Sequence, residues 1–155
     1  MAKIIFITIL LHLSIYANQS ENISPNFSDT QIDLLQSIED KALIYGSGKK
    51  KVYLFIDPWC QYSRKFVSLV SHNPQMLSKY QYFIYLYAIP RLHSTKAIAA
   101  VYQSKEPLQT LLNIMLKDDK TTSLLTQATQ NKMDAIASVA KSLNIHKRPF
   151  LIIQK

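Results

Sequence analysis

Glycine is scarce in this sequence, where only Gly46 and Gly48 occur among 155 residues. Nucleotide-binding loops of both common types need several glycines in a short stretch, because their backbone must approach a phosphate closely. The scarcity of glycine therefore excludes a glycine-rich nucleotide-binding loop of either type.

Cysteine is scarcer still, since Cys60 is the only one. A single cysteine forms no internal disulfide and no zinc knuckle, and the four histidines show no close ligand spacing. We therefore expect no metal site and no cofactor. The thiol of Cys60 is either reactive, bonded to another molecule, or buried as an inert apolar group.

The length of 155 residues and the hydrophobic content of 48% favour one domain with a real core. The formal net charge of +8 is compatible with polyanion binding, but most of the charges are scattered. The exception is the run 49–51, which consists of three lysines and reads as a solvated loop. Because no nucleic-acid-binding motif is present, we expect no nucleic-acid partner.

The first residues have the pattern of an export signal. Lys3 precedes the mostly apolar stretch 4–13, and the small residue Ala17 follows. We therefore expect a signal peptide over 1–17, or an uncleaved N-terminal anchor, then a flexible segment over 18–27 and a folded domain over 28–155. Export through such a signal predicts a periplasmic, secreted protein.

The hydrophobic pattern of the folded part alternates between helices and short strands, which indicates an α/β fold. A capping box at Ser28–Gln31 begins the first helix. The expected elements are helix 28–45, strand 52–56, helix 60–73, strand 80–88, helices 94–102, 107–115 and 133–143, and strand 150–153.

Cys60 lies directly before one of these helices. Helix N-termini carry a partial positive charge and free N–H groups, which favour a thiolate over a thiol. Arg64 and Lys65 add positive potential in the first turn, unless they are an ordinary solvated face. A serine, Ser63, stands where a second cysteine would complete Cys-x-x-Cys. The site therefore has an attacking group and lacks the resolving thiol.

With Asp57-Pro58, Cys60 and Tyr62-Ser63 in place, residues 28–155 resemble the periplasmic thioredoxin-fold disulfide isomerases of bacteria, the DsbC/DsbG-like family. Further similarity lies in three segments, which resemble the family's next strand with its proline, its inserted helical region and its proline loop: 85–90, 96–108 and 148–152. The resemblance implies an α/β thioredoxin-like fold with a central mixed sheet and an inserted helical region.

The resemblance also implies roles at the site. Pro149 would be cis and face Cys60, and the backbone of Arg148 would pair with a substrate strand. Trp59, Gln61 and Tyr62 would contact substrate, although Trp59 and Tyr62 could instead belong to the core.

The sequence departs from the family in four ways. Ser63 replaces the resolving cysteine, and Arg148 replaces a small hydroxyl residue, where it could cover the thiol or recruit acidic substrates. No counterpart of the N-terminal dimerisation domain is found, and the last strand and helix of the family are expected to be missing.

The function implied is that of a monothiol thiol-disulfide isomerase or reductase. Cys60 thiolate would attack disulfides of exported or unfolded polypeptides and form a mixed disulfide, which a thiol of the substrate, a redox partner or a small thiol would release. The alternative is a redox-silent thioredoxin-like module that binds polypeptides or joins an envelope assembly.

Overall fold

The computed structural model describes residues 27–154. The expected signal peptide 1–17 and all but the last residue of the expected flexible segment 18–27 lie outside the described residues. No helix of the described part is long and apolar enough to cross a membrane.

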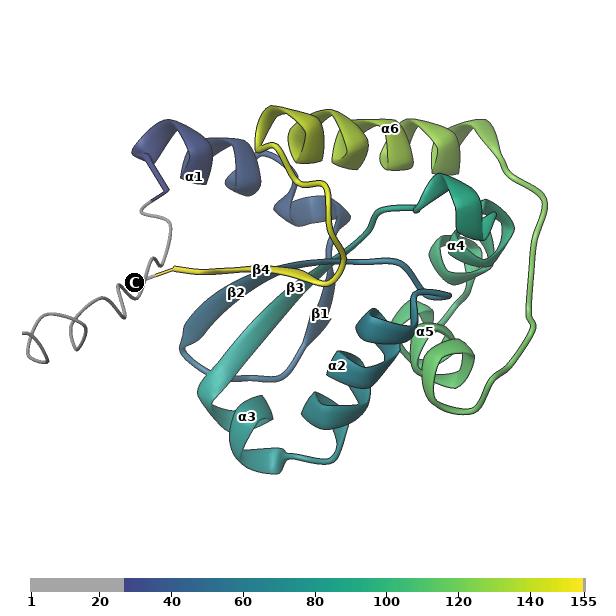
Figure 1. The fold of residues 1–155 in the computed structure, drawn as a ribbon, viewed down its shortest axis with the longest axis horizontal. Coiled ribbons are helices and arrows are strands. Elements are labelled where there is room, and N and C mark those ends of the chain that lie inside the picture. The colour runs from purple at the N-terminus through teal and green to yellow at the C-terminus, as the bar shows by residue number, and fades with distance from the viewer. Residues whose placement is uncertain (1–26, 155) are drawn as a thin grey trace, which may run out of the picture.

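The described residues form an α/β fold, in which one mixed sheet carries helices on both faces (Figure 1). The strands are β1 (Leu43–Tyr45), β2 (Lys50–Ile56), β3 (Tyr80–Leu86) and β4 (Phe150–Ile153). The α-helices are α1 (Asp29–Gln36), α2 (Gln61–Ser71), α3 (Pro74–Lys79), α4 (Thr95–Gln103), α5 (Pro107–Leu116) and α6 (Gln127–Ser142). Two 3-10 turns are η1 (Glu39–Lys41) and η2 (Pro90–Leu92).

The strand order is β1-β3-β2-β4. β2 and β3 are parallel, whereas β1 runs antiparallel to β3 and β4 runs antiparallel to β2. Parallel neighbours end at the same edge of a sheet, and ligands bind at that edge in open α/β sheets. The segments that follow β2 and β3 therefore meet at one edge, and Cys60 lies in the first of them.

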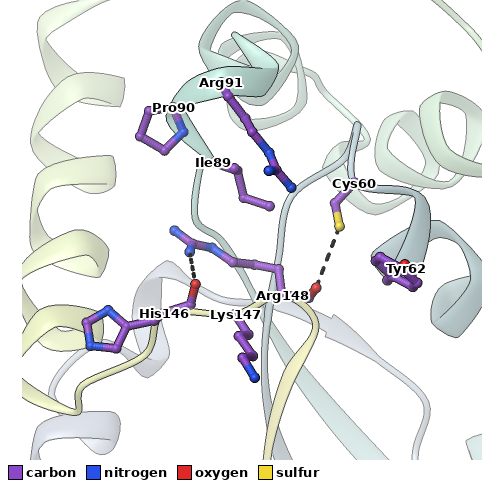
Figure 2. Close-up of a pocket in the computed structure, with 8 residues that line it drawn as sticks. All are labelled: Cys60, Tyr62, Ile89, Pro90, Arg91, His146, Lys147 and Arg148. Atoms are coloured by element: carbon purple, nitrogen blue, oxygen red, sulfur yellow. Dashed lines mark hydrogen bonds between the residues drawn. The ribbon is translucent and has the colours of Figure 1, made fainter.

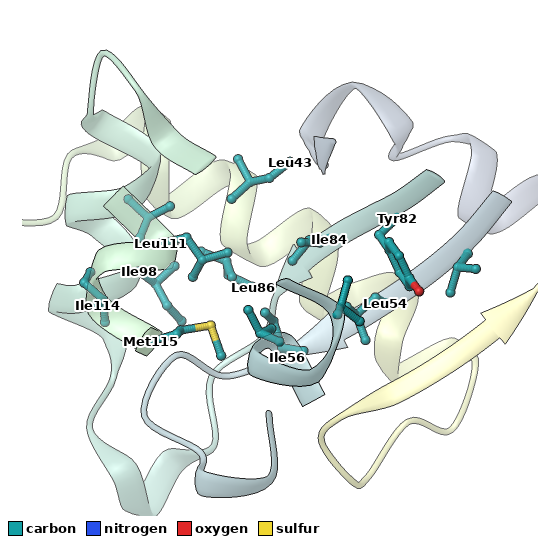
Figure 3. Close-up of a cluster of buried hydrophobic side chains, with 14 residues drawn as sticks. Leu43, Leu54, Ile56, Tyr82, Ile84, Leu86, Ile98, Leu111, Ile114 and Met115 are labelled. Atoms are coloured by element: carbon teal, nitrogen blue, oxygen red, sulfur yellow. The ribbon is translucent and has the colours of Figure 1, made fainter. Parts of the chain in front are cut away.

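The two faces of the sheet build two hydrophobic clusters, because successive side chains of a strand point to opposite sides. On one face, Leu54 and Ile56 of β2 pack in a cluster with Ile98 of α4 and Leu111 of α5 (Figure 3). On the other face, the cluster of β2 residues with α1 and α6 contains Tyr53, Phe55, Leu35 and Ile136. Each fully buried side chain of this size contributes about 1.5–3 kcal/mol.

The first helix is shorter than expected. The capping box is present, since Ser28 Oγ accepts from the Gln31 N–H and the Gln31 side chain accepts from the Ser28 N–H. The prediction of one continuous helix over 28–45 is wrong, because α1 ends at Gln36, Glu39–Lys41 is a 3-10 turn and Leu43–Tyr45 is a strand. Pairing with β3 gives this segment backbone hydrogen bonds and buries Leu43. These gains outweigh the tendency to form a helix that the spacing of its apolar residues indicates.

A short helix was missed after α2. Asn73-Pro74 does end α2, but it also begins α3: the Asn73 side chain accepts from the Met76 N–H, and Pro74 occupies the first turn. The remaining expected helices and strands are present, although α6 begins at Gln127 rather than at 133.

Candidate functional site

Cys60 is the N-cap residue of α2. Its N–H donates to the Asp57 carbonyl at 3.0 Å, and its carbonyl accepts from the Arg64 N–H at 2.9 Å, which starts the helix. The side chain caps no N–H group of α2. Instead, Cys60 Sγ lies 3.6 Å from the carbonyl oxygen of Arg148, within reach of a weak S–H···O bond (Figure 2). The residue is 6% exposed, so only a small part of it is open to solvent.

The turn before Cys60 is held by the fully buried carboxylate of Asp57. Its Oδ1 accepts from the Trp59 N–H at 2.8 Å, and its Oδ2 accepts from the Ile89 N–H at 2.6 Å and from Ser94 Oγ at 2.7 Å. One carboxylate thus joins the end of β2 to the segment after β3 and to the start of α4. In the sequence, Asp57 counts only toward the family resemblance, and its role in holding the site together was missed.

Arg148 braces the loop that faces Cys60. Its guanidinium donates from Nε to the Tyr87 carbonyl at 3.0 Å, from Nη2 to the Ala88 carbonyl at 2.8 Å and from Nη1 to the His146 carbonyl at 3.2 Å. It also stacks on the Tyr87 ring, 3.7 Å from the centroid. The side chain points away from Cys60 (Figure 2). Of the two alternatives for Arg148, covering the thiol with its side chain is therefore wrong, and recruitment of acidic substrates stays a prediction. The Arg148–Pro149 peptide bond is cis, the isomer that the resemblance implies.

A cleft of about 570 Å³ opens beside the sulfur. Its walls come from the turn before α2, the segment after β3 and the loop before β4 (Figure 2). The residues that line it are Cys60, Tyr62, Ile89, Pro90, Arg91, His146, Lys147 and Arg148. The cleft therefore lies at the sheet edge where β2 and β3 end.

Comparison with known proteins rests on structure, because the sequence matches no protein-family model and no curated protein. A linker-deletion mutant of ScsC from Proteus mirabilis is similar with a TM-score of 0.61 at 19% identity, over 79% of this chain and 72% of that one. DsbG from Helicobacter pylori gives 0.60 at 17% identity, over 81% and 62%. A disulfide interchange protein from Neisseria gonorrhoeae gives 0.57 at 18% identity, over 76% and 86%. The chain has a thioredoxin-like fold.

On this thioredoxin-like fold, Trp59, Gln61 and Tyr62, which were expected to contact substrate, lie in three different environments. Tyr62 lines the cleft and is 60% exposed, so it belongs to the surface. Trp59 is partly buried against the core cluster of α2, α4 and α5, so it is mainly a packing residue. Gln61 is exposed but does not line the cleft.

Ser63 is fully buried in the first turn of α2. Its Oγ accepts from the Asp57 N–H at 3.4 Å. The hydroxyl therefore supports the turn at the end of β2 and is not presented to the cleft, which Ser63 does not line.

Arg64 is neither a solvated residue nor directed at the thiol. Its Nε donates to the Pro58 carbonyl at 2.9 Å, its Nη2 donates to the Ile114 carbonyl at 3.0 Å, and its Nη1 pairs with Asp118 at 2.9 Å. Hydrogen bonds from Lys120 and Arg64 lower the pKa of Asp118. Arg64 thus fastens the start of α2 to the end of α5, while Lys65 is exposed.

The sequence analysis did not assign two parts of the cleft to the site. They are Ile89–Arg91 after β3, and His146 with Lys147 before β4. The first could have been found, because parallel strands bring the segments at their carboxyl ends together. Among residues 27–154, no three His, Cys, Asp or Glu side chains are grouped so as to hold a metal ion.

Proposed function

We propose that this protein is a monothiol thiol-disulfide oxidoreductase that acts on disulfides of exported polypeptides. The observation that supports it is the position of Cys60 Sγ, at the start of α2 and 3.6 Å from the carbonyl of the residue before cis-Pro149. A sulfur at a helix N-terminus and the backbone of Arg148 opposite it give an attacking group and a polar edge for the same substrate. The likeness to disulfide-exchange proteins supports the proposal at the level of the fold.

The reaction begins with ionised Cys60. The thiolate, not the thiol, is the attacking species, and Cys60 lies at the N-terminus of α2, the positive end of the helix dipole. The thiolate attacks one sulfur of the substrate disulfide, whose S–S bond breaks as a bond to Cys60 forms. The other half of the substrate leaves as a thiolate. Cys60 becomes oxidised to the mixed disulfide, and the departing half is reduced.

Release of the mixed disulfide needs a thiol from outside. Ser63 occupies the place of a resolving cysteine, and a serine hydroxyl is too weakly acidic to displace a disulfide. If a second thiol of the substrate attacks, the outcome is isomerisation. If a small thiol or a redox partner attacks, the outcome is reduction.

Substrate contacts follow from the lining of the cleft. The exposed ring of Tyr62 lies on one side, and Ile89 and Pro90 lie on the other, so an unfolded polypeptide meets apolar surface beside the sulfur. The backbone of Arg148 pairs with the extended substrate, and the side chain of Arg148 keeps the loop in place. We assign the periplasm as the site of action, on the basis of the export pattern in residues 1–17.

A second function is favoured by the burial of the thiol. Cys60 is only 6% exposed and its sulfur faces a carbonyl, which are also the properties of an inert packing thiol. On that alternative the protein is a redox-silent module that binds polypeptides or joins an envelope assembly.

One experiment distinguishes the two proposed functions. The full chain is incubated with a peptide disulfide, quenched with acid, and examined by intact mass, with Cys60→Ser as the control. We expect an adduct on the folded wild-type protein that persists until dithiothreitol is added. An adduct that forms only in denaturant would overturn the proposed activity and favour the redox-silent module.

A further inference from the structure

The lining of the cleft beside Cys60 carries charge of one sign. Arg91, Lys147 and Arg148 are cationic, His146 is a fourth basic group, and no aspartate or glutamate lines the cleft. Arg148 is occupied by backbone carbonyls, as described above. The exposed side chains of Arg91 and Lys147 take no part in any ion pair among residues 27–154.

The acidic group nearest in sequence to Cys60 lies inside the fold and does not line the cleft. Asp57 is fully buried, and both of its oxygens accept hydrogen bonds from inside the fold. Asp118 is paired with Arg64 and Lys120 and does not line the cleft. The basic groups therefore face solvent without a compensating carboxylate in the lining.

We propose that the cleft selects disulfides that carry negative charge close to the S–S bond, with Arg91 and Lys147 as the groups that select. Figure 2 draws the guanidinium of Arg91 toward the space between Ile89 and Cys60. Arg91 and Lys147 belong to different segments, before α4 and before β4. Figure 2 draws the side chain of Lys147 away from Cys60, so Lys147 contributes its charge at the outer rim of the cleft, whereas Arg91 reaches toward the sulfur. Oxidised glutathione and polypeptides with Asp or Glu beside the cysteine have this chemistry.

The selection rests on the proposed function, because it acts on the approach of the disulfide to Cys60. Attacking and departing groups are thiolates, so a carboxylate beside the disulfide adds repulsion to an already negative reaction centre. Cations on the walls offset that repulsion and raise the local concentration of anionic substrate. Selection by charge does not alter the bonds that form and break in the proposed reaction. The substrate S–S bond breaks, the Cys60–S bond forms, and the leaving half departs as a thiolate.

The test uses three aliphatic disulfides that differ in charge. Oxidised glutathione is anionic, 2-hydroxyethyl disulfide is neutral, and cystamine is cationic. The rate constant for adduct formation on Cys60 is measured with the full chain by quenched mass spectrometry, at low and at high salt. We expect the rate constant to be largest for the anionic disulfide, smaller for the neutral one and smallest for the cationic one. The differences should shrink at high salt, because exposed charges are screened.

Variants locate the effect. Arg91→Gln and Lys147→Gln should each lower the ratio of the rate with oxidised glutathione to the rate with 2-hydroxyethyl disulfide about two- to fivefold, as expected for one exposed charge pair. The matched control is the double variant Lys49→Gln/Lys50→Gln. It removes two exposed charges at the far end of β2, roughly 20 Å from its carboxyl end, and should leave the anionic preference intact.

The outcomes separate the two proposals. If the neutral disulfide reacts and the anionic one is no faster, or if the control variant lowers the anionic rate as much as Arg91→Gln/Lys147→Gln does, the selection is refuted and the exchange activity stands. If none of the three disulfides reacts with the folded protein, the proposed function fails and the selection fails with it.

Discussion

The buried carboxylate of Asp57 accepts a 2.7 Å hydrogen bond from the hydroxyl of Ser94, which joins the turn before Cys60 to the start of α4. Ser94 is the N-cap residue of α4, yet its hydroxyl caps no N–H group of that helix. The same Asp57 oxygen accepts from the Ile89 N–H at 2.6 Å. Two walls of the cleft are therefore fixed by one carboxylate.

Removing the acceptor should loosen both walls. Asp57→Asn keeps the shape of the side chain but puts an NH₂ group where the carboxylate accepts, so buried donors lose partners. We expect a loss of about 2–3 kcal/mol in the free energy of unfolding, and about 1–2 kcal/mol for Ser94→Ala. Urea unfolding followed by circular dichroism measures both. The control is Ser78→Ala, at an exposed position, which should change the free energy of unfolding by less than about 0.5 kcal/mol. A Ser94→Ala protein as stable as the wild type would contradict this assignment.

The absence of a resolving thiol is tested by Ser63→Cys. Ser63 lies three residues after Cys60 in the first turn of α2, so the new thiol is held close to the mixed disulfide. We expect the lifetime of the mixed disulfide without added thiol to fall about tenfold or more, because an intramolecular attack has a high effective concentration. Decay is followed by intact mass.

The control for that change is Ser68→Cys on the same helix. Ser68 lies eight residues after Cys60, roughly 12 Å along the helix axis, so its thiol does not reach the mixed disulfide. Equal lifetimes for Ser63→Cys and the wild type would show that release does not depend on the missing thiol.

The sequence was most informative where one segment carries its own signal. Cys60 at the start of a helix and the helix from Pro107 follow from local patterns, and both are present. The sequence was least informative where pairing with a distant strand determines the secondary structure of a segment. Residues 43–45 have helical spacing but pair with β3, and a helical pattern does not show that competing partner.

Side-chain direction was the other limit. From their places in the chain, Arg64 is expected to add positive potential or to be solvated, and Arg148 to cover the thiol or to recruit acidic substrates. In the fold, each guanidinium turns to backbone carbonyls that lie about 50 or 60 residues away, such as those of Ile114 and Tyr87. Such partners follow from tertiary packing, so the sequence alone did not predict them.

A stability measurement distinguishes the structural role of Arg148 from the substrate-selecting role proposed for Arg91 and Lys147. Arg148→Met removes three hydrogen bonds to carbonyls and the stacking on Tyr87, so we expect the free energy of unfolding to fall by about 1–3 kcal/mol. Arg148→Lys should not restore it, since an ammonium does not reproduce the planar fork. Urea unfolding gives the measurement. A loss of anionic preference with unchanged stability would instead place Arg148 with the selecting groups.

The two glycines give a prediction of steric origin. Both lie between β1 and β2, against the junction of α3 and β3. A Cβ atom at Gly48 would overlap the backbone of Lys79 and Tyr80, which cannot move without displacing β3. We expect Gly48→Ala to destabilise the fold by about 3 kcal/mol or more, measured by urea unfolding. Ser47→Ala, at the exposed neighbouring position, is the control and should be close to neutral. Similar stability of the two variants would contradict the predicted overlap.

Alkaline pH should unfold this protein through its buried tyrosines. Burial raises the pKa of Tyr85 above the usual value of about 10, and neighbouring charges of Tyr53 and Glu39 add to it. Burial and the hydrogen bond to Glu39 raise the pKa of Tyr53 in the same way. Above pH 10 the unfolded chain therefore releases protons that the folded chain retains, so stability falls as pH rises, by up to about 1.4 kcal/mol per pH unit for each tyrosine.

Tyr85→Phe isolates one of these protons. The hydroxyl of Tyr85 makes only a long hydrogen bond, 3.4 Å to the Leu35 carbonyl, so we expect a cost below about 1 kcal/mol at pH 7, where the tyrosine is neutral in both states. Between pH 10 and 11 the variant should lose stability less steeply than the wild type, because one group fewer titrates on unfolding. Urea unfolding at pH 7, 10 and 11 gives the two slopes. Equal slopes would mean that Tyr85 ionises as readily in the folded protein as in the unfolded chain, and that water reaches its hydroxyl.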